Sequence, residues 1–170
     1  MPLLSLEGLL ALRAGWRARG LRVVLTNGVF DLIHAGHVGY LERARALGDL
    51  LVVALNSDAS TRAIKGPLRP IVPEGDRAAV LAALRPVDYV TLFDEPTAEA
   101  VVEALRPEVY VKGGDYAGPA DGAPDLARLP EGRIVAAYGG QVTLLPFAEG
   151  RSTSALIARI VERYGGPGLR

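Results

Sequence analysis

The chain has 170 residues, of which 49% are hydrophobic, 22% charged and 6% aromatic, which suits one packed domain and excludes a disordered chain. Lys plus Arg equals Asp plus Glu, 19 against 19, so no general basic field exists for nucleic acid or an anionic membrane, and any phosphate site has to be local. The lack of cysteine excludes disulfides and thiolate metal sites.

The amino-terminal segment predicts an amphipathic helix over residues 3–18. Its leucines recur at close to helical spacing, and Gly20 closes the run. The run contains Glu7 and has no basic n-region, and no apolar stretch of the chain reaches the roughly 20 residues of a membrane span. We therefore expect a cytoplasmic protein without a signal peptide or a membrane partner.

A strand, a loop and a helix follow. The run "LRVVLT", residues 21–26, is short, apolar and β-branched, which predicts a buried strand. The segment "HVGYLERARALG" places Val38, Leu41 and Ala44 on one helical stripe and stops at Gly48. Between them, "NGVFDLIHAG" is expected to leave the strand as a loop.

The same alternation continues along the chain and indicates a doubly wound, Rossmann-like α/β fold, a five-stranded parallel sheet with helices on both faces. Ligands of such sheets bind beyond the carboxyl ends of the strands, so the loops after residues 26, 56, 93, 112 and 146 are the expected site. Strands are expected over residues 50–55, 88–93, 108–112 and 141–146, and helices over residues 76–84, 97–105 and 153–163 and near residues 133–140.

The loop "NGVFDLIHAG" and the helix after it carry both histidines of the chain, His34 and His37. Gly28 and Gly36 let the backbone approach a ligand, and His37 lies at a helix start, where free N–H groups favour an anion. Two imidazoles there can donate hydrogen bonds to phosphate oxygens during phosphoryl or nucleotidyl transfer. This is the functional interpretation of the pair.

Other interpretations compete with it. A histidine beside a helix start is often a structural hydrogen-bonding residue. A zinc pair needs at least a third ligand, and only carboxylates remain for it. The glycine-rich dinucleotide fingerprint and the P-loop are both absent from the sequence.

The segment "GVFDLIHAGH" resembles the HxGH signature of the nucleotidyltransferase superfamily that contains the cytidylyltransferases. The resemblance extends over several motifs and covers roughly residues 20–163. After the first motif, the chain has in the family's order the segments "VALNSD", "IKGPLRPI", "VKGGDY" and "LPFAEGRSTS". The nearest branch is the heptose 1-phosphate adenylyltransferases, which occur alone or joined to a sugar kinase. No kinase domain fits in 170 residues, so the resemblance implies the stand-alone form, with residues 1–170 as a single nucleotidyltransferase domain.

The resemblance also implies roles for individual residues. His34 and His37 would bind the triphosphate and stabilise the transition state, and Lys65, on a Pro- and Gly-rich loop, would close over the phosphates as the family's mobile lysine. Lys65 and Lys112 are the only lysines among 19 basic residues. The implied nucleotide contacts are Gly28, Val29, Phe30, Gly36, Gly113, Asp115, Phe147, Ser152, Thr153 and Ser154. The implied contacts with the second substrate are Asn27, Asp31, Asp58, Arg77 and Lys112.

Some of these assignments stay open. Asp31 suits a structural anchor or a neighbour of phosphate and metal, and Ser152 also suits an ordinary helix cap. In a related form of the last motif a basic residue stands where this chain has Ile157, and Arg159 lies two positions further on. Phe147 replaces an arginine with which glycerol-phosphate cytidylyltransferases bind CTP, and an apolar ring favours stacking on adenine.

The resulting expectation is an enzyme that transfers AMP from ATP to a sugar 1-phosphate, most simply D-glycero-D-manno-heptose 1-phosphate, and releases pyrophosphate. Mg²⁺ would be held mainly by the triphosphate, with no residue binding metal directly, and the family tendency implies a homodimer that binds no nucleic acid. One alternative is a cytidylyltransferase acting on glycerol 3-phosphate or a phospho-alcohol. Another is a nucleotide-binding regulatory module without turnover.

Overall fold

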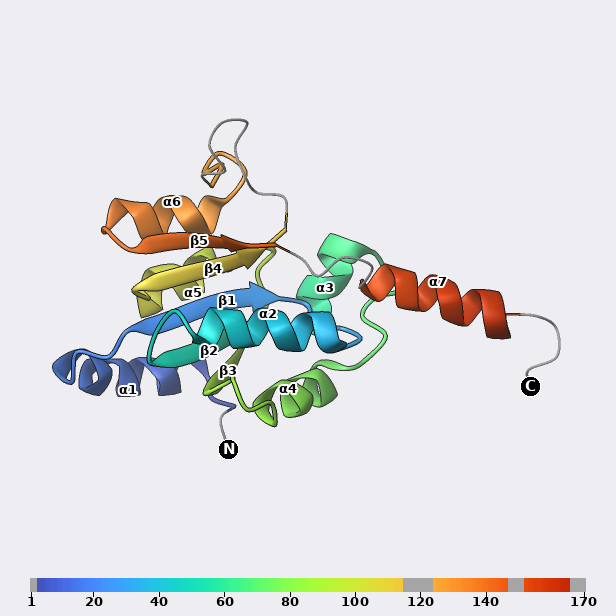
Figure 1. Cartoon of the computed structure of the whole chain (residues 1–170), viewed down its shortest axis with the longest axis horizontal. Coiled ribbons are helices and arrows are strands. Elements are labelled where there is room, and N and C mark those ends of the chain that lie inside the picture. Colours follow the sequence, from blue (N-terminus) through green and yellow to red (C-terminus); the bar gives the residue numbers. More distant parts are fainter. Residues whose placement is uncertain (1–2, 115–123, 147–151, 166–170) are drawn as a thin grey trace.

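The fold is a five-stranded sheet in the order β3-β2-β1-β4-β5 (Figure 1), in a computed structural model that describes residues 3–114, 124–146 and 152–165. Every neighbouring pair of strands is parallel, which confirms the predicted doubly wound α/β class. Strand order reverses at β1, so the switch point lies between β1 and β4. The strands are β1 (Val23–Gly28), β2 (Leu50–Asn56), β3 (Tyr89–Phe93), β4 (Val109–Gly113) and β5 (Gln141–Leu145).

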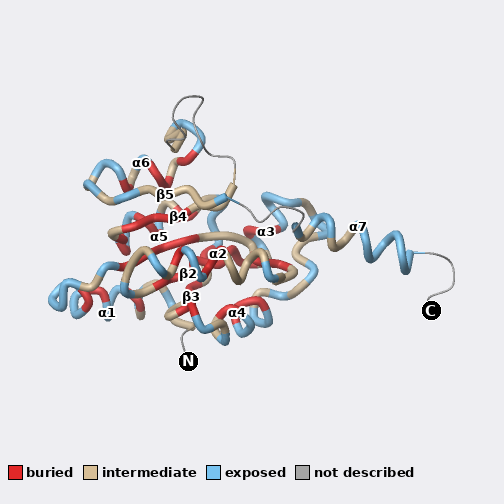
Figure 2. Tube along the Cα trace, viewed as in Figure 1, coloured by how far each residue is buried: buried red, intermediate tan, exposed pale blue. Residues whose placement is uncertain are grey.

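Helices cover both faces of the sheet because alternate strand residues point to opposite sides. Val23 and Leu25 pack with α1 (Leu6–Ala18), α5 (Glu99–Leu105) and α6 (Pro130–Ala137). Val24 packs on the other face with α2 (Ala35–Arg45) and α4 (Glu74–Ala82). The buried residues therefore follow the strands and the inner sides of these helices (Figure 2).

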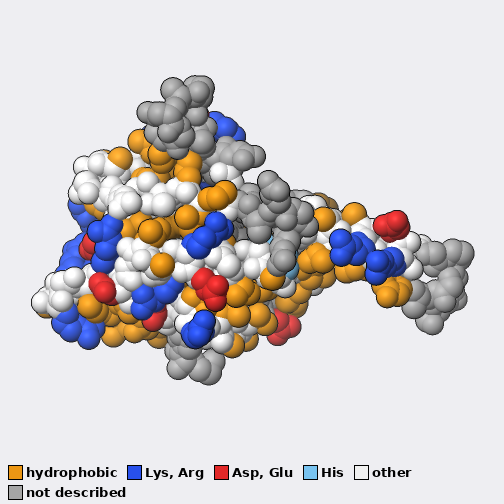
Figure 3. All heavy atoms as spheres, in the orientation of Figure 1, with side chains coloured by type: hydrophobic (Ala, Val, Ile, Leu, Met, Phe, Trp, Pro, Cys, Tyr) orange, Lys and Arg blue, Asp and Glu red, His pale blue; other side chains and the backbone are white. Residues whose placement is uncertain are grey.

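Two helices lie away from these layers. The eight-residue α3 (Asp58–Lys65) follows β2 at the carboxyl edge of the sheet, and α7 (Thr153–Tyr164), none of whose residues is buried, extends outward from the body (Figure 1). Basic and acidic side chains are interspersed on the face drawn in Figure 3. Over the residues that the structure describes, no helix is both long and apolar enough to cross a bilayer.

The structure corrects two boundaries near the expected site. β1 continues through Asn27 and Gly28, which were expected in a loop, because these residues stay in parallel register with Ala54 and Leu55 of β2. The helix α3 was not predicted, and it places Lys65 in its last turn rather than in a loop. Gly66 follows it at a φ of 93°, a backbone conformation that glycine adopts without strain.

Candidate active site

A cleft of about 1330 Å³ lies at the carboxyl edge of the sheet. Segments distant in the sequence border it, among them the end of β1, the start of α2, the end of α3, the end of β4 and the start of α7. The predicted site residues that line it are Asn27, Gly28, Val29, Phe30, Asp31, His34, Gly36, His37, Lys65, Lys112, Gly113, Ser152, Thr153 and Ser154. Asp58 and Arg77 do not line it, and Asp115 and Phe147 lie outside the described residues.

The two histidines use one ring nitrogen each to hold the start of α2. His34 is the N-cap, and its Nδ1 accepts a hydrogen bond from the Gly36 N–H at 3.1 Å, while His37 Nδ1 accepts from the His34 N–H at 3.4 Å. The two rings stack with their centroids 4.0 Å apart. Because Nδ1 accepts in both rings, this network assigns the neutral tautomer that carries its proton on Nε2.

His37 stays neutral at physiological pH. Burial and, to a smaller extent, electrostatic repulsion from the neighbouring His34 together lower its pKa from 6.5 to about 4. Phe30 contributes to this environment, since its ring lies 5.4 Å from the His37 ring. A neutral imidazole in a cleft presents a hydrogen-bond donor without the desolvation cost of a buried cation.

Phe30 adopts a left-handed backbone conformation, with a φ of 46°, and is 7% exposed. Such a conformation in a bulky residue costs of order 1–3 kcal/mol and is held by the packing around it. Gly28 makes room for it, because a Cβ at that position would lie 3.1 Å from the Phe30 ring. The strained turn thus brings the Phe30 ring beside His37.

The two lysines reach the cleft in different ways. Lys65 is exposed at the end of α3, whereas Lys112 on β4 is largely enclosed and donates from Nζ to Asn27 Oδ1 at 2.8 Å. The Tyr110 hydroxyl donates to the same oxygen at 2.7 Å. Burial lowers the pKa of Lys112, the negative charge of Glu131 raises it, and the positive charge of Lys65 lowers it. The charges of these three side chains therefore influence one another in the cleft.

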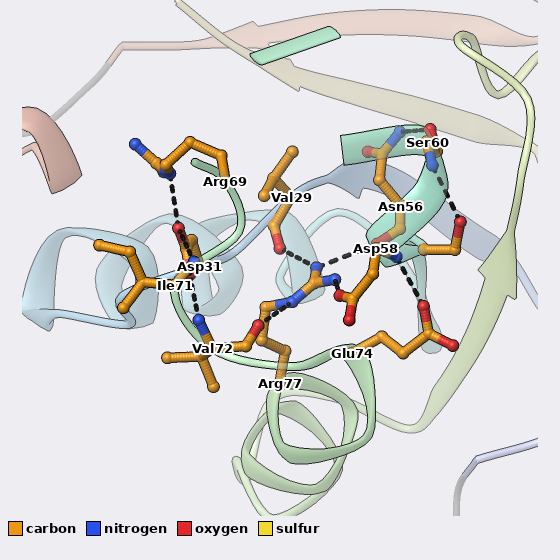
Figure 4. A network of polar contacts seen from close by, with 11 residues as sticks. Val29, Asp31, Asn56, Asp58, Ser60, Arg69, Ile71, Val72, Glu74 and Arg77 are labelled. Carbon is orange, nitrogen blue, oxygen red and sulfur yellow. Dashed lines mark hydrogen bonds and ion pairs between the residues drawn. The ribbon is translucent and has the colours of Figure 1, made fainter. Parts of the chain in front are cut away.

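Asp31 anchors the segment after α3 to the histidine loop (Figure 4). Its carboxylate is 3% exposed and accepts hydrogen bonds from the N–H groups of Ile71 and Val72, both at 2.9 Å, and from Arg69 Nε at 2.7 Å. Burial alone raises its pKa, but the hydrogen bonds and the Arg69 charge outweigh burial and lower the pKa below its usual value. The structure therefore favours the structural anchor among the roles left open for Asp31.

Arg77 is a buried brace rather than a cleft residue. It is 1% exposed, and its guanidinium donates an ion-paired hydrogen bond to Asp58 Oδ1 at 2.7 Å. Its other donors join three segments (Figure 4) through the carbonyl oxygens of Val29, Asn56 and Val72. This placement does not favour the predicted contacts of Arg77 and Asp58 with a sugar phosphate, because both side chains are occupied with each other.

The start of α7 presents the predicted Ser and Thr segment to the cleft. Ser152 is the N-cap, and its Oγ accepts a hydrogen bond from the Ala155 N–H at 3.1 Å. Thr153 and Ser154 line the cleft beside it. A helix start carries free N–H groups that suit phosphate oxygens. Ile157 and Arg159, one turn or more further along α7, do not line the cleft.

The structure adds Glu131, which the sequence analysis missed. This residue lies in the first turn of α6, is 4% exposed and lines the cleft. Its Oε1 accepts a hydrogen bond from the Ala98 N–H at 3.1 Å. A single Glu in the "LPEG" run gives no sequence signal, because only the fold brings it to the end of another helix.

No group of three His, Asp or Glu side chains within the described ranges is placed to hold a metal ion. The oxygens of Asp31 are occupied by Arg69 and by backbone N–H groups, so this carboxylate is not a free ligand.

The comparisons with known proteins agree with this geometry. The cytidylyltransferase-like family profile matches residues 25–159. The chain is 52% identical over 148 residues to the bifunctional protein HldE of Syntrophotalea carbinolica and 47% identical over 165 residues to that of Geobacter metallireducens. These matches cover 87% and 95% of this chain, which spans only 29% and 31% of those relatives.

Two solved structures share the fold. The lipopolysaccharide core biosynthesis protein from Thermoplasma volcanium is 30% identical with a TM-score of 0.58, over 78% of this chain and 100% of that one. The pantoate-beta-alanine ligase from Francisella tularensis is 11% identical with a TM-score of 0.62, over 91% of this chain and 69% of that one, a likeness of fold alone. With its parallel sheet, its HAGH turn and a family match over most of its length, the chain belongs to the cytidylyltransferase-like family of nucleotidyltransferases.

Proposed function

We propose that the chain transfers AMP from ATP to a sugar 1-phosphate, with D-glycero-D-manno-heptose 1-phosphate as the leading candidate. The observation that carries the proposal is the convergence of His34, His37, Lys65, Lys112 and the start of α7 on one cleft. The match to HldE proteins and to a lipopolysaccharide core biosynthesis protein supports a sugar substrate.

In this proposal an oxygen of the sugar phosphate attacks the α-phosphorus of ATP, and the bond to the β-phosphate breaks to release pyrophosphate. The sugar phosphate is already a nucleophile, so no covalent enzyme intermediate is required. Catalysis then consists of alignment and charge stabilisation. The Nε2–H donors of His34 and His37 contact the oxygens on which charge accumulates.

Other groups assist from the rim of the cleft. Lys65 ends α3 beside Gly66, so its ammonium can move onto the phosphates, and the N–H groups at the start of α7 bind further oxygens. A divalent cation, which we propose to be Mg²⁺, supplies charge neutralisation when bound to the triphosphate. The family tendency to dimerise supports the further proposal of a homodimer of single-domain subunits.

Pyrophosphate release tests the proposal. The purified chain is assayed with ATP and with CTP against heptose 1-phosphate, other sugar 1-phosphates and glycerol 3-phosphate. The proposal predicts release that requires both ATP and a sugar 1-phosphate. Release with CTP and glycerol 3-phosphate would replace it by a cytidylyltransferase, and nucleotide-induced stabilisation without any release would indicate a regulatory module.

A further inference from the structure

The cleft has two polar walls on opposite faces of the sheet. His34 and His37 belong to the face covered by α2. Asn27 lies two residues after Leu25 on β1, and Lys112 two residues after Tyr110 on β4, so both side chains belong to the face covered by α5 and α6. The two histidines therefore lie on one wall of the cleft, and Lys112 lies on the other.

Glu131 completes the wall that holds Lys112. Its carboxylate is 4% exposed and lines the cleft, but only Oε1 has a hydrogen-bond partner within the described part of the chain, the Ala98 N–H at 3.1 Å. The second oxygen, Oε2, is not sealed off from solvent, so it is open to the cleft and available to a hydroxyl donor of a ligand. The charges of Glu131 and Lys112 also act on each other across this wall.

The two charges define the chemistry of a ligand. An ammonium binds a phosphate, whereas a carboxylate repels phosphate and accepts hydrogen bonds from hydroxyl groups. Two further polar residues line the cleft, Asn56 at the end of β2 and Thr97 after β3. A phosphate that adjoins several hydroxyls, as in a sugar 1-phosphate, fits this arrangement.

We infer that Glu131 is a specificity-determining residue that accepts hydrogen bonds from ring hydroxyls of the acceptor sugar while Lys112 holds its phosphate. This inference rests on the proposed function, because it assigns the second substrate of the same cleft. It differs from a capping role at α5, which needs only Oε1 and the Ala98 N–H.

The experiment compares Glu131→Gln with the wild-type chain. Glutamine keeps the volume and the carbonyl oxygen that caps α5 but loses the charged acceptor. Glu103→Gln is the matched control, since Glu103 is an exposed carboxylate on α5 and does not line the cleft. We expect Glu131→Gln to raise the KM for the sugar phosphate about 10- to 100-fold and to leave the KM for ATP and the thermal midpoint at the control values.

Acceptors that lack one hydroxyl give a second readout. The wild-type chain should discriminate against the deoxy sugar that has lost the contact, and Glu131→Gln should lose that discrimination while keeping its discrimination against the other deoxy sugars. A pure capping role would change neither pattern. Unchanged KM values in Glu131→Gln, or a rise in the KM for ATP instead, would overturn the inference.

Failure of the proposed function is distinguishable from failure of the inference. If the wild-type chain releases no pyrophosphate with any sugar phosphate, the proposed function fails. Calorimetric titration with the same sugar phosphates then tests Glu131 without turnover. Weaker binding to Glu131→Gln than to Glu103→Gln supports the contact, and equal binding or no binding overturns it.

Discussion

At the residue scale, His34 and His37 each commit Nδ1 to the start of α2, and our proposal gives Nε2 of each ring to the ligand. The two functions separate in His34→Asn, because asparagine is a good N-cap but has no donor at the position of Nε2. We expect turnover to fall about 10²- to 10³-fold, equivalent to about 3–4 kcal/mol of barrier. The free energy of unfolding should stay within about 0.5 kcal/mol of wild type.

His34→Ala provides the comparison. It removes the cap as well as the donor, so the same loss of turnover should come with a loss of about 1 kcal/mol in the free energy of unfolding. Urea denaturation and initial-rate assays measure the two effects separately. Wild-type turnover in a folded His34→Asn protein contradicts the assigned role of the imidazole.

His37 should make the stability of the ligand-free protein pH-dependent. Its pKa is lowered to about 4 in the folded chain from 6.5, so the unfolded chain binds more protons between these values. The free energy of unfolding therefore falls as the pH drops from 6.5 towards 4. In wild type, His37 contributes to the difference between the free energies of unfolding at pH 7 and at pH 5. His37→Asn should make this difference smaller by about 1 kcal/mol, a value reduced for solvent screening. Identical pH profiles of the two proteins in urea would disprove this.

At the scale of elements, Asp31 holds the segment after α3 against the turn that carries the histidines. Asp31→Ala should lower the free energy of unfolding by about 2–3 kcal/mol, because it removes charge-assisted hydrogen bonds and leaves N–H groups unpaired. The carboxylate's lowered pKa means that its contribution is present above the unfolded pKa of about 4 and is lost as the pH falls through the folded value.

Hydrogen exchange reports the same contact locally. The amides of Ile71 and Val72 should exchange faster in Asp31→Ala than in Asp94→Asn, which alters an exposed acidic residue as a control. Exchange at the wild-type rate at both amides would show that Asp31 does not anchor this segment.

The strands and long helices were predictable because their apolar residues recur with the period of the element. The strand expected over residues 50–55 is β2 (Leu50–Asn56) for this reason. The helix α3 was missed because its buried residues are Ser60 and Thr61 rather than apolar side chains, and the Ser57 cap fixes its start. The helix expected near residues 133–140 begins earlier, at Pro130, whose fixed φ suits a first turn.

At the scale of the whole molecule, local and long-range parts of the site differ in how well the sequence predicted them. The geometry of His34 and His37 follows from a spacing of three residues at a helix start. The bond from Lys112 to Asn27 depends on the packing of β4 beside β1, and the contact of Glu131 with Ala98 depends on two helices. The burial of Arg77 likewise arises only from tertiary packing, so the sequence could not show that its guanidinium is engaged by Asp58 and by backbone carbonyl groups.

An isotope experiment tests the central claim, that this cleft transfers AMP to the phosphate of a sugar. The chain is given ATP and heptose 1-phosphate with ¹⁸O in its phosphate, and both products are analysed by mass spectrometry. Attack of the sugar phosphate on the α-phosphorus predicts ¹⁸O in the ADP-sugar and unlabelled pyrophosphate, with His34→Asn about 10²- to 10³-fold slower. Labelled pyrophosphate, or ATP cleavage without an ADP-sugar, would contradict it.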